Sequence, residues 1–195
     1  MPRALTEKER CSQCERLLEK GKEAVFIRGI RKVSVDDITK AAGMAKGLFY
    51  QHFESKEEYL LRLIWYVQDQ LFSQAEQMIL NKKDLPADMR GFLIDLFNMP
   101  ELMLLIKNYY DISELMNSMT DHEAQAIEQK EEYMFGKMLL LAGIDTQKVK
   151  PGVVHNYLHT LYMMRGCDMM IKKDVQETFD SMIDSLVFYI CRGAH

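Results

Sequence analysis

Residues 33–56 read VSVDDITKAAGMAKGLFYQHFESK and contain two short helical patterns joined by a turn. Ser34 and Asp37 form a capping box, because the hydroxyl can accept the Asp37 amide while the carboxylate reaches back to the cap. Apolar residues follow at helical spacing, and Gly43 stands where a helix ends in a left-handed conformation. A second short helix is expected over residues 45–53. This order is typical of a helix-turn-helix, whose second helix enters the major groove of DNA.

The same residues resemble the tetracycline-repressor (TetR) family of bacterial transcription regulators. The family pattern reads G-x-x-x-x-[TS]-V-x-D-I-A-x-x-A-G-V-S-K-G-T-L-Y-x-x-F-x-S-K-E-x-L. The chain matches it without a gap at Gly29, Ser34, Val35, Asp37, Ile38, Ala42, Gly43, Lys46, Gly47, Tyr50, Phe53, Ser55, Lys56 and Glu57, and Leu60 follows one position after the final Leu of the pattern. The resemblance covers about the first quarter of the chain. It implies a dimeric, all-α repressor with a ligand-responsive C-terminal domain.

Three departures from the family pattern matter. Ala45 stands where a Ser normally caps the second helix, Leu48 replaces a Thr that faces DNA, and Val25 replaces a large aromatic residue. Ala45 and Leu48 favour a second interpretation, in which a helical adaptor keeps the helix-turn-helix shape but binds protein. Weak, salt-insensitive binding to DNA would favour that adaptor.

The resemblance and the side-chain chemistry together predict the DNA contacts. Gln51 is suited to reading a base because its amide can pair with adenine, whereas Leu48 offers only apolar contact, such as with a thymine methyl. Phe49 and Phe53 are better placed than Tyr50 to face the first helix, so Tyr50 is expected to project outward to a phosphate. The alternative for Tyr50 is an aromatic residue of the core, and the alternative for Lys46 is a lysine that only contacts solvent. The predicted DNA-contact residues are Ser34, Lys46, Gly47, Leu48, Tyr50, Gln51, His52 and Lys56.

Composition and charge fit a globular protein with one basic end. The 195 residues are 48% apolar and 28% charged, which allows a full hydrophobic core and gives no sign of disorder. The net charge is −4, yet residues 1–56 carry 12 Lys/Arg and 8 Asp/Glu, so this part is +4 and the remainder is −8. A basic end suits phosphate binding. We therefore predict a DNA-binding domain over residues 1–54 and a ligand-binding and dimerisation domain over residues 55–195.

The cysteines and the hydropathy indicate a reduced compartment. The chain has no apolar run of about 18 residues and no signal-peptide core, so we expect a cytoplasmic protein without a membrane partner. Its four cysteines do not form the disulfide framework of a secreted domain. Cys11 and Cys14 lack the further ligands of a zinc site. They are interpreted as small apolar residues or partly exposed thiols, and a redox sensor near the DNA-binding end is the alternative.

Helical periodicity continues along the whole chain, and no segment alternates convincingly as a strand. The pattern predicts an all-α fold of about nine helices, with a three-helix head and a C-terminal helical bundle. The expected helices cover residues 6–27, 35–42, 45–53, 56–80, 87–97, 100–110, 121–141, 153–171 and 175–192.

The last two expected helices have broad apolar faces. The family resemblance implies that they form a four-helix bundle with the same helices of a second copy. An ordinary intramolecular core is the alternative, and the width of an apolar stripe does not distinguish the two. The predicted dimer-interface residues are Tyr157, Leu161, Tyr162, Met169, Phe179, Met182, Ile183, Leu186 and Ile190.

Methionine is abundant, 15 of 195 residues, and concentrates in the C-terminal part. Because Met is flexible and polarisable, it suits a pocket for a small hydrophobic or aromatic effector, although it also fills gaps in ordinary cores. His155 and His159 lie one turn apart, but no third metal ligand is evident, so we predict neither a metal site nor a cofactor. The predicted pocket residues are Trp65, Tyr66, Met103, Tyr110, Tyr133, Met134, Met138, His159 and Met163.

Taken together, these features predict a ligand-responsive transcriptional repressor that binds a palindromic operator as a homodimer and is released by a small effector. An enzyme is the competing class. The sequence has no Ser-His-Asp arrangement, glycine-rich phosphate loop or carboxylate pair with an evident partner, so we predict no enzymatic activity.

Overall fold

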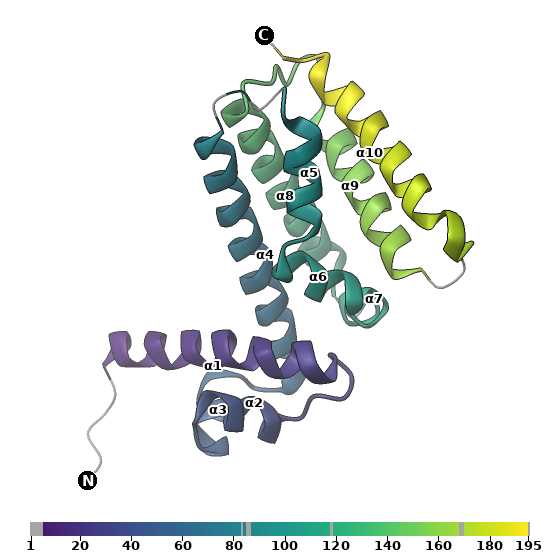
Figure 1. Ribbon diagram of the computed structural model, residues 1–195. Coiled ribbons are helices and arrows are strands. Elements are labelled where there is room, and N and C mark those ends of the chain that lie inside the picture. Colours follow the sequence, from purple (N-terminus) through teal and green to yellow (C-terminus); the bar gives the residue numbers. More distant parts are fainter. Residues whose placement is uncertain (1–5, 83, 85–86, 118, 168–169, 195) are drawn as a thin grey trace. The chain divides into compact units, whose positions relative to one another are not determined.

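Ten α-helices and one 3-10 helix make up the described chain (Figure 1). The structure is a computed structural model that describes residues 6–82, 84, 87–117, 119–167 and 170–194. The elements are α1 (Glu7–Arg28), α2 (Val35–Ala42), α3 (Lys46–His52), α4 (Lys56–Asn81), α5 (Met89–Phe97), α6 (Pro100–Lys107), α7 (Tyr109–Met116), α8 (Asp121–Leu141), α9 (Pro151–Gly166), η1 (Lys172–Asp174) and α10 (Val175–Cys191). The predicted all-α class is confirmed. Within these residues, no helix has an apolar stretch long enough to cross a membrane.

Most of the expected helix ranges agree with the structure, and two differ. The helix expected over residues 100–110 ends just before Asn108, and α7 begins directly afterwards. The Asn108 side-chain amide donates to the Leu104 carbonyl at 2.8 Å, a local hydrogen bond that competes with continuation of the helix. The helix expected over residues 153–171 begins earlier, at Pro151, because proline is favoured in a first turn, and it ends at Gly166.

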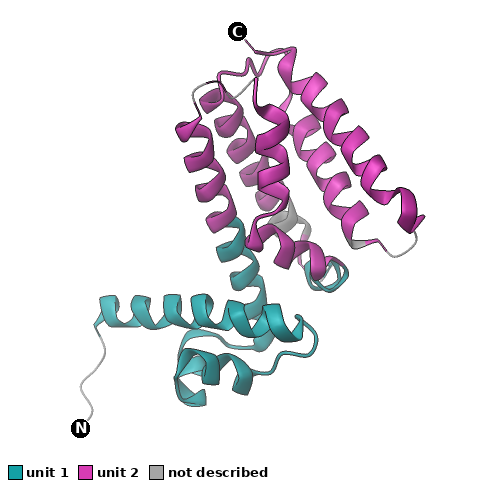
Figure 2. Cartoon of the chain, viewed as in Figure 1, with its two compact units in different colours: residues 1–68, 110–117 teal, residues 69–109, 118–195 magenta. Residues whose placement is uncertain are grey.

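The chain forms two compact units, which are coloured separately in Figure 2. Unit 1 comprises residues 1–68 and 110–117, and unit 2 comprises residues 69–109 and 118–195. Unit 1 therefore contains the first half of α4 and most of α7 in addition to α1, α2 and α3. The predicted boundary between a DNA-binding domain (residues 1–54) and a ligand-binding and dimerisation domain (residues 55–195) separates two functions rather than two compact units, and it stays a prediction.

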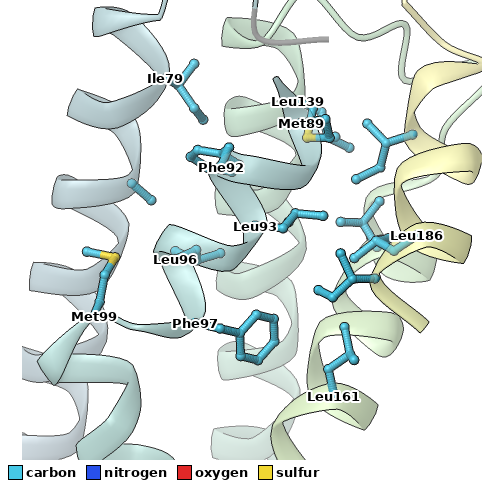
Figure 3. Packing of buried hydrophobic residues seen from close by; sticks show 14 of the residues in the cluster. Ile79, Met89, Phe92, Leu93, Leu96, Phe97, Met99, Leu139, Leu161 and Leu186 are labelled. Carbon is cyan, nitrogen blue, oxygen red and sulfur yellow. The ribbon is translucent and has the colours of Figure 1, made fainter. Parts of the chain in front are cut away.

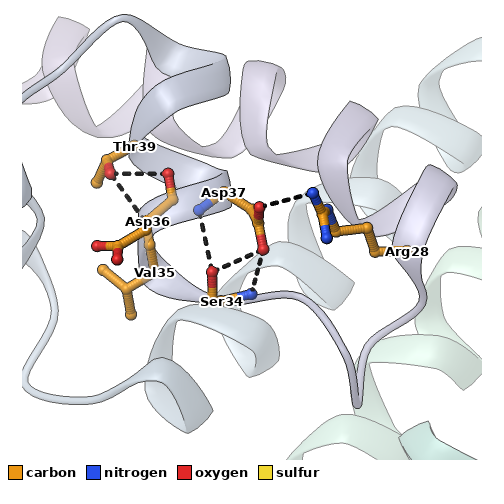
Figure 4. A network of polar contacts seen from close by, with 6 residues as sticks. All are labelled: Arg28, Ser34, Val35, Asp36, Asp37 and Thr39. Atoms are coloured by element: carbon orange, nitrogen blue, oxygen red, sulfur yellow. Dashed lines mark hydrogen bonds and ion pairs between the residues drawn. The ribbon is translucent and has the colours of Figure 1, made fainter.

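Local signals explain how the helix-turn-helix is built. The Ser34 hydroxyl accepts the Asp37 amide at 3.2 Å, and the Asp37 carboxylate accepts the Ser34 amide at 3.0 Å (Figure 4). The Ser34 hydroxyl also donates to that carboxylate at 2.6 Å, and this hydrogen bond, followed by that of the Ser34 amide, lowers the pKa of Asp37. Arg28 pairs with the same carboxylate at 3.1 Å. Gly43 ends α2 in the left-handed region, with φ 63° and ψ 38°, so the predicted capping box and turn are confirmed.

An aromatic core fixes α3 on the rest of unit 1. The rings of Phe49, Phe53 and Tyr59 lie with centroids 5.0–5.3 Å apart, and all three side chains are buried. The Tyr59 hydroxyl donates to the Leu17 carbonyl at 3.0 Å, which joins α4 to α1. The predicted inward orientation of Phe49 and Phe53 is confirmed, and it leaves the opposite face of α3 to solvent.

Unit 2 buries a separate apolar core that is drawn in Figure 3. Phe97 of α5 and Phe179 of α10 meet edge to face with centroids 5.2 Å apart. The Arg165 guanidinium lies 4.4 Å from the Phe179 ring centroid and donates to the Phe97 carbonyl at 3.2 Å. Buried residues of α4, α5, α8, α9 and α10 complete the core, among them Ile79, Met89, Phe92, Leu93, Leu96, Leu139, Leu161, Ile183, Leu186 and Ile190.

This core changes the expected dimer interface. Five of the predicted interface side chains are at most 2% exposed within the single chain: Leu161, Phe179, Ile183, Leu186 and Ile190. Since they already pack on their own chain, the intramolecular alternative describes them better than contact with a second copy. Tyr157, Tyr162 and Met182 are half-buried, and Met169 lies outside the described residues. The outer face of α10 carries Phe188 instead, which is 80% exposed.

Candidate nucleic-acid interface

One face of α3 presents predicted contact residues to solvent above a rigid core. Tyr50 is 53% exposed, and Lys46, Gly47 and Gln51 are exposed beside it. Leu48 is half-buried. The helix N-cap is Ala45, which makes no side-chain capping hydrogen bond, so the departure from the family pattern has the expected local effect.

An ion pair links α3 to the start of α2. The Lys46 ammonium lies 2.9 Å from a carboxylate oxygen of Asp36, and both side chains are exposed. The hydrogen bond and charge of Asp36 raise the pKa of Lys46. A phosphate that approaches Lys46 would therefore compete with a carboxylate that is already in place. Asp36 was not identified from the sequence, because an acidic residue in a first helical turn is also the usual dipole partner.

Three further predicted contact residues have intramolecular partners. The Ser34 hydroxyl belongs to the capping box, and the Lys56 ammonium donates to the Val33 carbonyl at 3.3 Å. His52 lies with Nε2 3.2 Å from the Gln13 side-chain oxygen of α1, and burial lowers the pKa of His52. These contacts hold Ser34 and Lys56 at the start of α2 and hold His52 against α1. The three side chains therefore stabilise unit 1, in addition to being polar groups that a partner could contact.

The cysteines of α1 do not form an evident reactive site. Cys11 is exposed and Cys14 is half-buried, and none of the four cysteines, all of which lie in described parts of the chain, forms a disulfide bond. Burial raises the pKa of the Cys14 thiol, which disfavours the thiolate that oxidation requires. Among the described residues, no group of three or more side chains could hold a metal ion.

The structure divides the predicted pocket residues between the two units. Trp65, Tyr66 and Tyr110 belong to unit 1, and the other six, Met103, Tyr133, Met134, Met138, His159 and Met163, belong to unit 2. The Tyr66 hydroxyl donates to Glu19 at 2.8 Å. Tyr110 and Tyr133 are 64% and 70% exposed, whereas Met138 packs against the unit 2 core. The pocket stays a prediction.

Rings from α7 and α9 form an aromatic cluster in unit 2, which we define as Tyr109, His155, His159 and Tyr162. The Tyr109 ring centroid lies 5.9 Å from that of His159 and 5.2 Å from that of Tyr162. His155 neighbours His159 at 5.8 Å, and its Nε2 lies 3.2 Å from a carboxylate oxygen of Glu131. The cluster combines flat apolar surface with two imidazoles.

The two imidazoles of the aromatic cluster should make opposite contributions to the pH dependence of the free energy of unfolding. The hydrogen bond that His155 donates to the Glu131 carboxylate raises the pKa of His155. The stabilising contribution of this pair is therefore complete below an ordinary histidine pKa of about 6.5 and is lost as the pH rises through the raised value. The free energy of unfolding should therefore fall more in His155→Gln near pH 5.5 than near pH 8.5, as urea titrations would show.

His159→Gln is the matched control for His155→Gln. Burial, followed by the neighbouring His155, lowers the pKa of His159, so protonation of His159 destabilises the fold as the pH falls. Its replacement should lessen the loss of stability in acid. Equal effects of both variants at the two pH values would contradict a raised pKa for His155 and a lowered pKa for His159.

Comparisons with known proteins support a helix-turn-helix domain at the N-terminal end of the chain. Residues 17–63 match the model of the family described as bacterial regulatory proteins, tetR family. Over 50 residues the chain is 44% identical to the HTH-type transcriptional regulator YwcC of Bacillus subtilis, covering 26% of this chain and 22% of YwcC. Over 45 residues it is 49% identical to the HTH-type transcriptional repressor DhaR of Mycobacterium sp., covering 23% of each. These matches span less than a quarter of either relative.

Solved structures extend the similarity to the whole fold. A TetR-family transcriptional regulator from Pectobacterium atrosepticum aligns over 94% of this chain and 95% of its own, with a TM-score of 0.65 and 14% identity. FadR from Bacillus subtilis, solved in complex with stearoyl-CoA, aligns over 93% of this chain and 99% of its own, with a TM-score of 0.54 and 16% identity. The resemblance to the TetR family is confirmed: the chain has the family's N-terminal helix-turn-helix domain and the overall fold of its regulators.

Proposed function

We propose that the protein is a transcriptional repressor that binds a near-palindromic DNA operator and is released by a small hydrophobic effector. The observation that carries this proposal is the exposed face of α3, where Lys46, Tyr50 and Gln51 stand on a buried aromatic core. A rigid base under an exposed polar helix face is what major-groove recognition requires. Gln51 would read a base, while Tyr50 and Lys46 would contact phosphates.

The proposed repressor acts as a homodimer, because a single short recognition helix covers only one half-site and binds weakly. Two-fold symmetry of the protein then requires a near-palindromic operator. The exposed outer face of α10, with Phe188 at its centre, supports an interface there, since a large ring at 80% exposure favours coverage by a second copy. The half-buried Tyr157 and Met182 remain candidates at its margin.

The effector of the proposed repressor is small and hydrophobic. The abundance of methionine supports this class, and so does the aromatic cluster of α7 and α9. FadR, which shares the fold, binds stearoyl-CoA in its crystal structure. Release follows if the effector prefers the conformation that binds DNA poorly, and a nearly complete switch needs about 5.5 kcal/mol of preference.

Selection of binding sites from random double-stranded DNA tests the proposed function. We expect an enriched duplex with two inverted half-sites, bound by two copies of the chain in analytical ultracentrifugation. Enrichment of nothing above background would instead favour the helical adaptor, with Leu48 and Ala45 as the first residues to revert to the family's Thr and Ser.

Replacing Asp36 by asparagine should strengthen DNA binding. The substitution removes the carboxylate that occupies Lys46, so the ammonium becomes available to a phosphate, and affinity for the selected duplex should rise by roughly two- to tenfold at low salt. Fluorescence anisotropy would measure it. Glu54→Gln removes one exposed negative charge from the same unit without touching Lys46, so an equal gain in that control would attribute the effect to net charge alone.

A further inference from the structure

The short helix α7 belongs to both units of the protein. Its first residue, Tyr109, lies in unit 2, and the remaining residues lie in unit 1 together with the helix-turn-helix. Besides α4, which runs continuously from residue 56 to residue 81, α7 is thus a second helix that continues from one unit into the other. Ile112, the buried residue of α7, is not a member of the unit 2 core.

Each end of α7 is fixed by a different kind of contact. In unit 2, the Tyr109 ring packs on His159 and Tyr162 of α9. In unit 1, the Arg31 guanidinium binds two carboxylates, that of Asp111 at 2.8 Å and that of Glu114. We call these three residues the Arg31 clasp. Because Asp111 and Glu114 are three positions apart in the helix, they lie on the same side of α7 and can face one guanidinium together.

The position of Arg31 connects the clasp to the segment that leads into α2. Arg31 lies between the end of α1 at Arg28 and the start of α2 at Val35, two residues before Val33, whose carbonyl accepts the Lys56 ammonium. A displacement of α7 that pulls Arg31 would therefore act on the segment that leads into α2. One guanidinium shared by two carboxylates is a small network, which holds better than an isolated surface pair.

We propose that the Arg31 clasp makes α7 a second transmission element, which carries the state of the aromatic cluster on α9 to the helix-turn-helix. This proposal rests on the proposed function and deepens it, since it names the residues through which the effector-binding unit regulates the DNA-binding unit. An effector that displaces Tyr109 moves the start of α7, and the clasp transfers that movement to the connection between α1 and α2. By thermodynamic reciprocity, DNA bound at α3 biases α7 in turn.

Hydrogen exchange measured by mass spectrometry tests the clasp on the full chain, with Arg31→Gln as the variant. In the absence of DNA, amides of residues 110–117 should exchange roughly three- to tenfold faster in Arg31→Gln than in the wild type, because α7 loses its ionic hold on unit 1. Asp111→Asn combined with Glu114→Gln removes the same contacts from the other side and should give the same increase.

Arg28→Gln is the matched control. It removes the same charge three residues before Arg31, and Arg28 pairs with Asp37 rather than with α7. Addition of the selected duplex should slow exchange in residues 110–117 of the wild type and of Arg28→Gln, but not in Arg31→Gln. Equal exchange of residues 110–117 in free wild type and Arg31→Gln would overturn the clasp. An undiminished response to DNA in Arg31→Gln would overturn its role in transmission.

The proposed function can fail separately from the clasp. If the wild type selects no duplex, the repressor is wrong and transmission to DNA falls with it, while the comparison of exchange in the free proteins still decides whether Arg31 holds α7. If the duplex binds and Arg31→Gln behaves as the wild type in both exchange experiments, the repressor stands and the inference about α7 is wrong.

Discussion

Replacing Gly21 by alanine is expected to lower the free energy of unfolding by about 2–4 kcal/mol, a large effect for one methyl group. A Cβ atom at Gly21 would lie 1.8 Å from the Tyr59 hydroxyl oxygen and 3.0 Å from a methyl carbon of Ile38. Tyr59 has little room to move, because its ring is fully buried and its hydroxyl donates to the Leu17 carbonyl. The clash therefore outweighs the gain of roughly 1 kcal/mol that alanine brings to a helix interior.

Thermal unfolding would measure the cost of Gly21→Ala, with an expected fall in Tm of about 5–15 °C for a chain of this size. Tyr59→Phe provides the control, because it removes the oxygen that the new methyl group would meet. Gly21→Ala should cost clearly less in that background than in the wild type. An equal cost in both backgrounds would show that contact with the hydroxyl is not the cause.

The second large effect is expected at Tyr50. Tyr50→Ala should weaken binding of the selected duplex by roughly 2–6 kcal/mol, or about 30-fold or more, because a two-fold complex loses the contact in both half-sites. The fold should survive, since half of the Tyr50 side chain is exposed and its ring packs at a T-shaped angle against the Phe49 ring rather than within the core. Anisotropy titration and circular dichroism would measure the two properties separately.

The adjacent Phe49 supplies the contrast to Tyr50. Its side chain is fully buried, so Phe49→Ala should lower the free energy of unfolding by about 3–5 kcal/mol and lose DNA binding only through loss of structure. If Tyr50→Ala unfolds the protein to a similar extent, Tyr50 is a structural residue rather than an outward-facing DNA contact.

The sequence predicted the parts of the fold that are determined locally. Ser34 and Asp37 cap α2 within one turn, and Gly43 ends it through its own backbone conformation, so neither feature depends on distant residues. The break between α6 and α7 was missed although it is also local, because an amide such as that of Asn108 fits a helix surface as well as it interrupts a helix.

Features that depend on distant residues escaped the sequence analysis for a physical reason. An apolar stripe shows that a face is covered but not by which chain, so Leu161 and Ile183 could equally belong to a dimer interface or to the intramolecular core that they form. The pairing of Arg31 with Glu114 joins residues 83 positions apart. No periodicity signals an ion pair at such a separation, because charged residues are common on every solvated surface.

The salt dependence of DNA binding tests the central claim most directly. The affinity of the wild type for the selected duplex would be titrated at 50 mM and at 200 mM salt. If two heads make roughly six to ten phosphate contacts, affinity should fall by about 10³–10⁵ between the two conditions. Weak binding that hardly changes with salt would contradict an operator-binding repressor and favour an adaptor that binds protein.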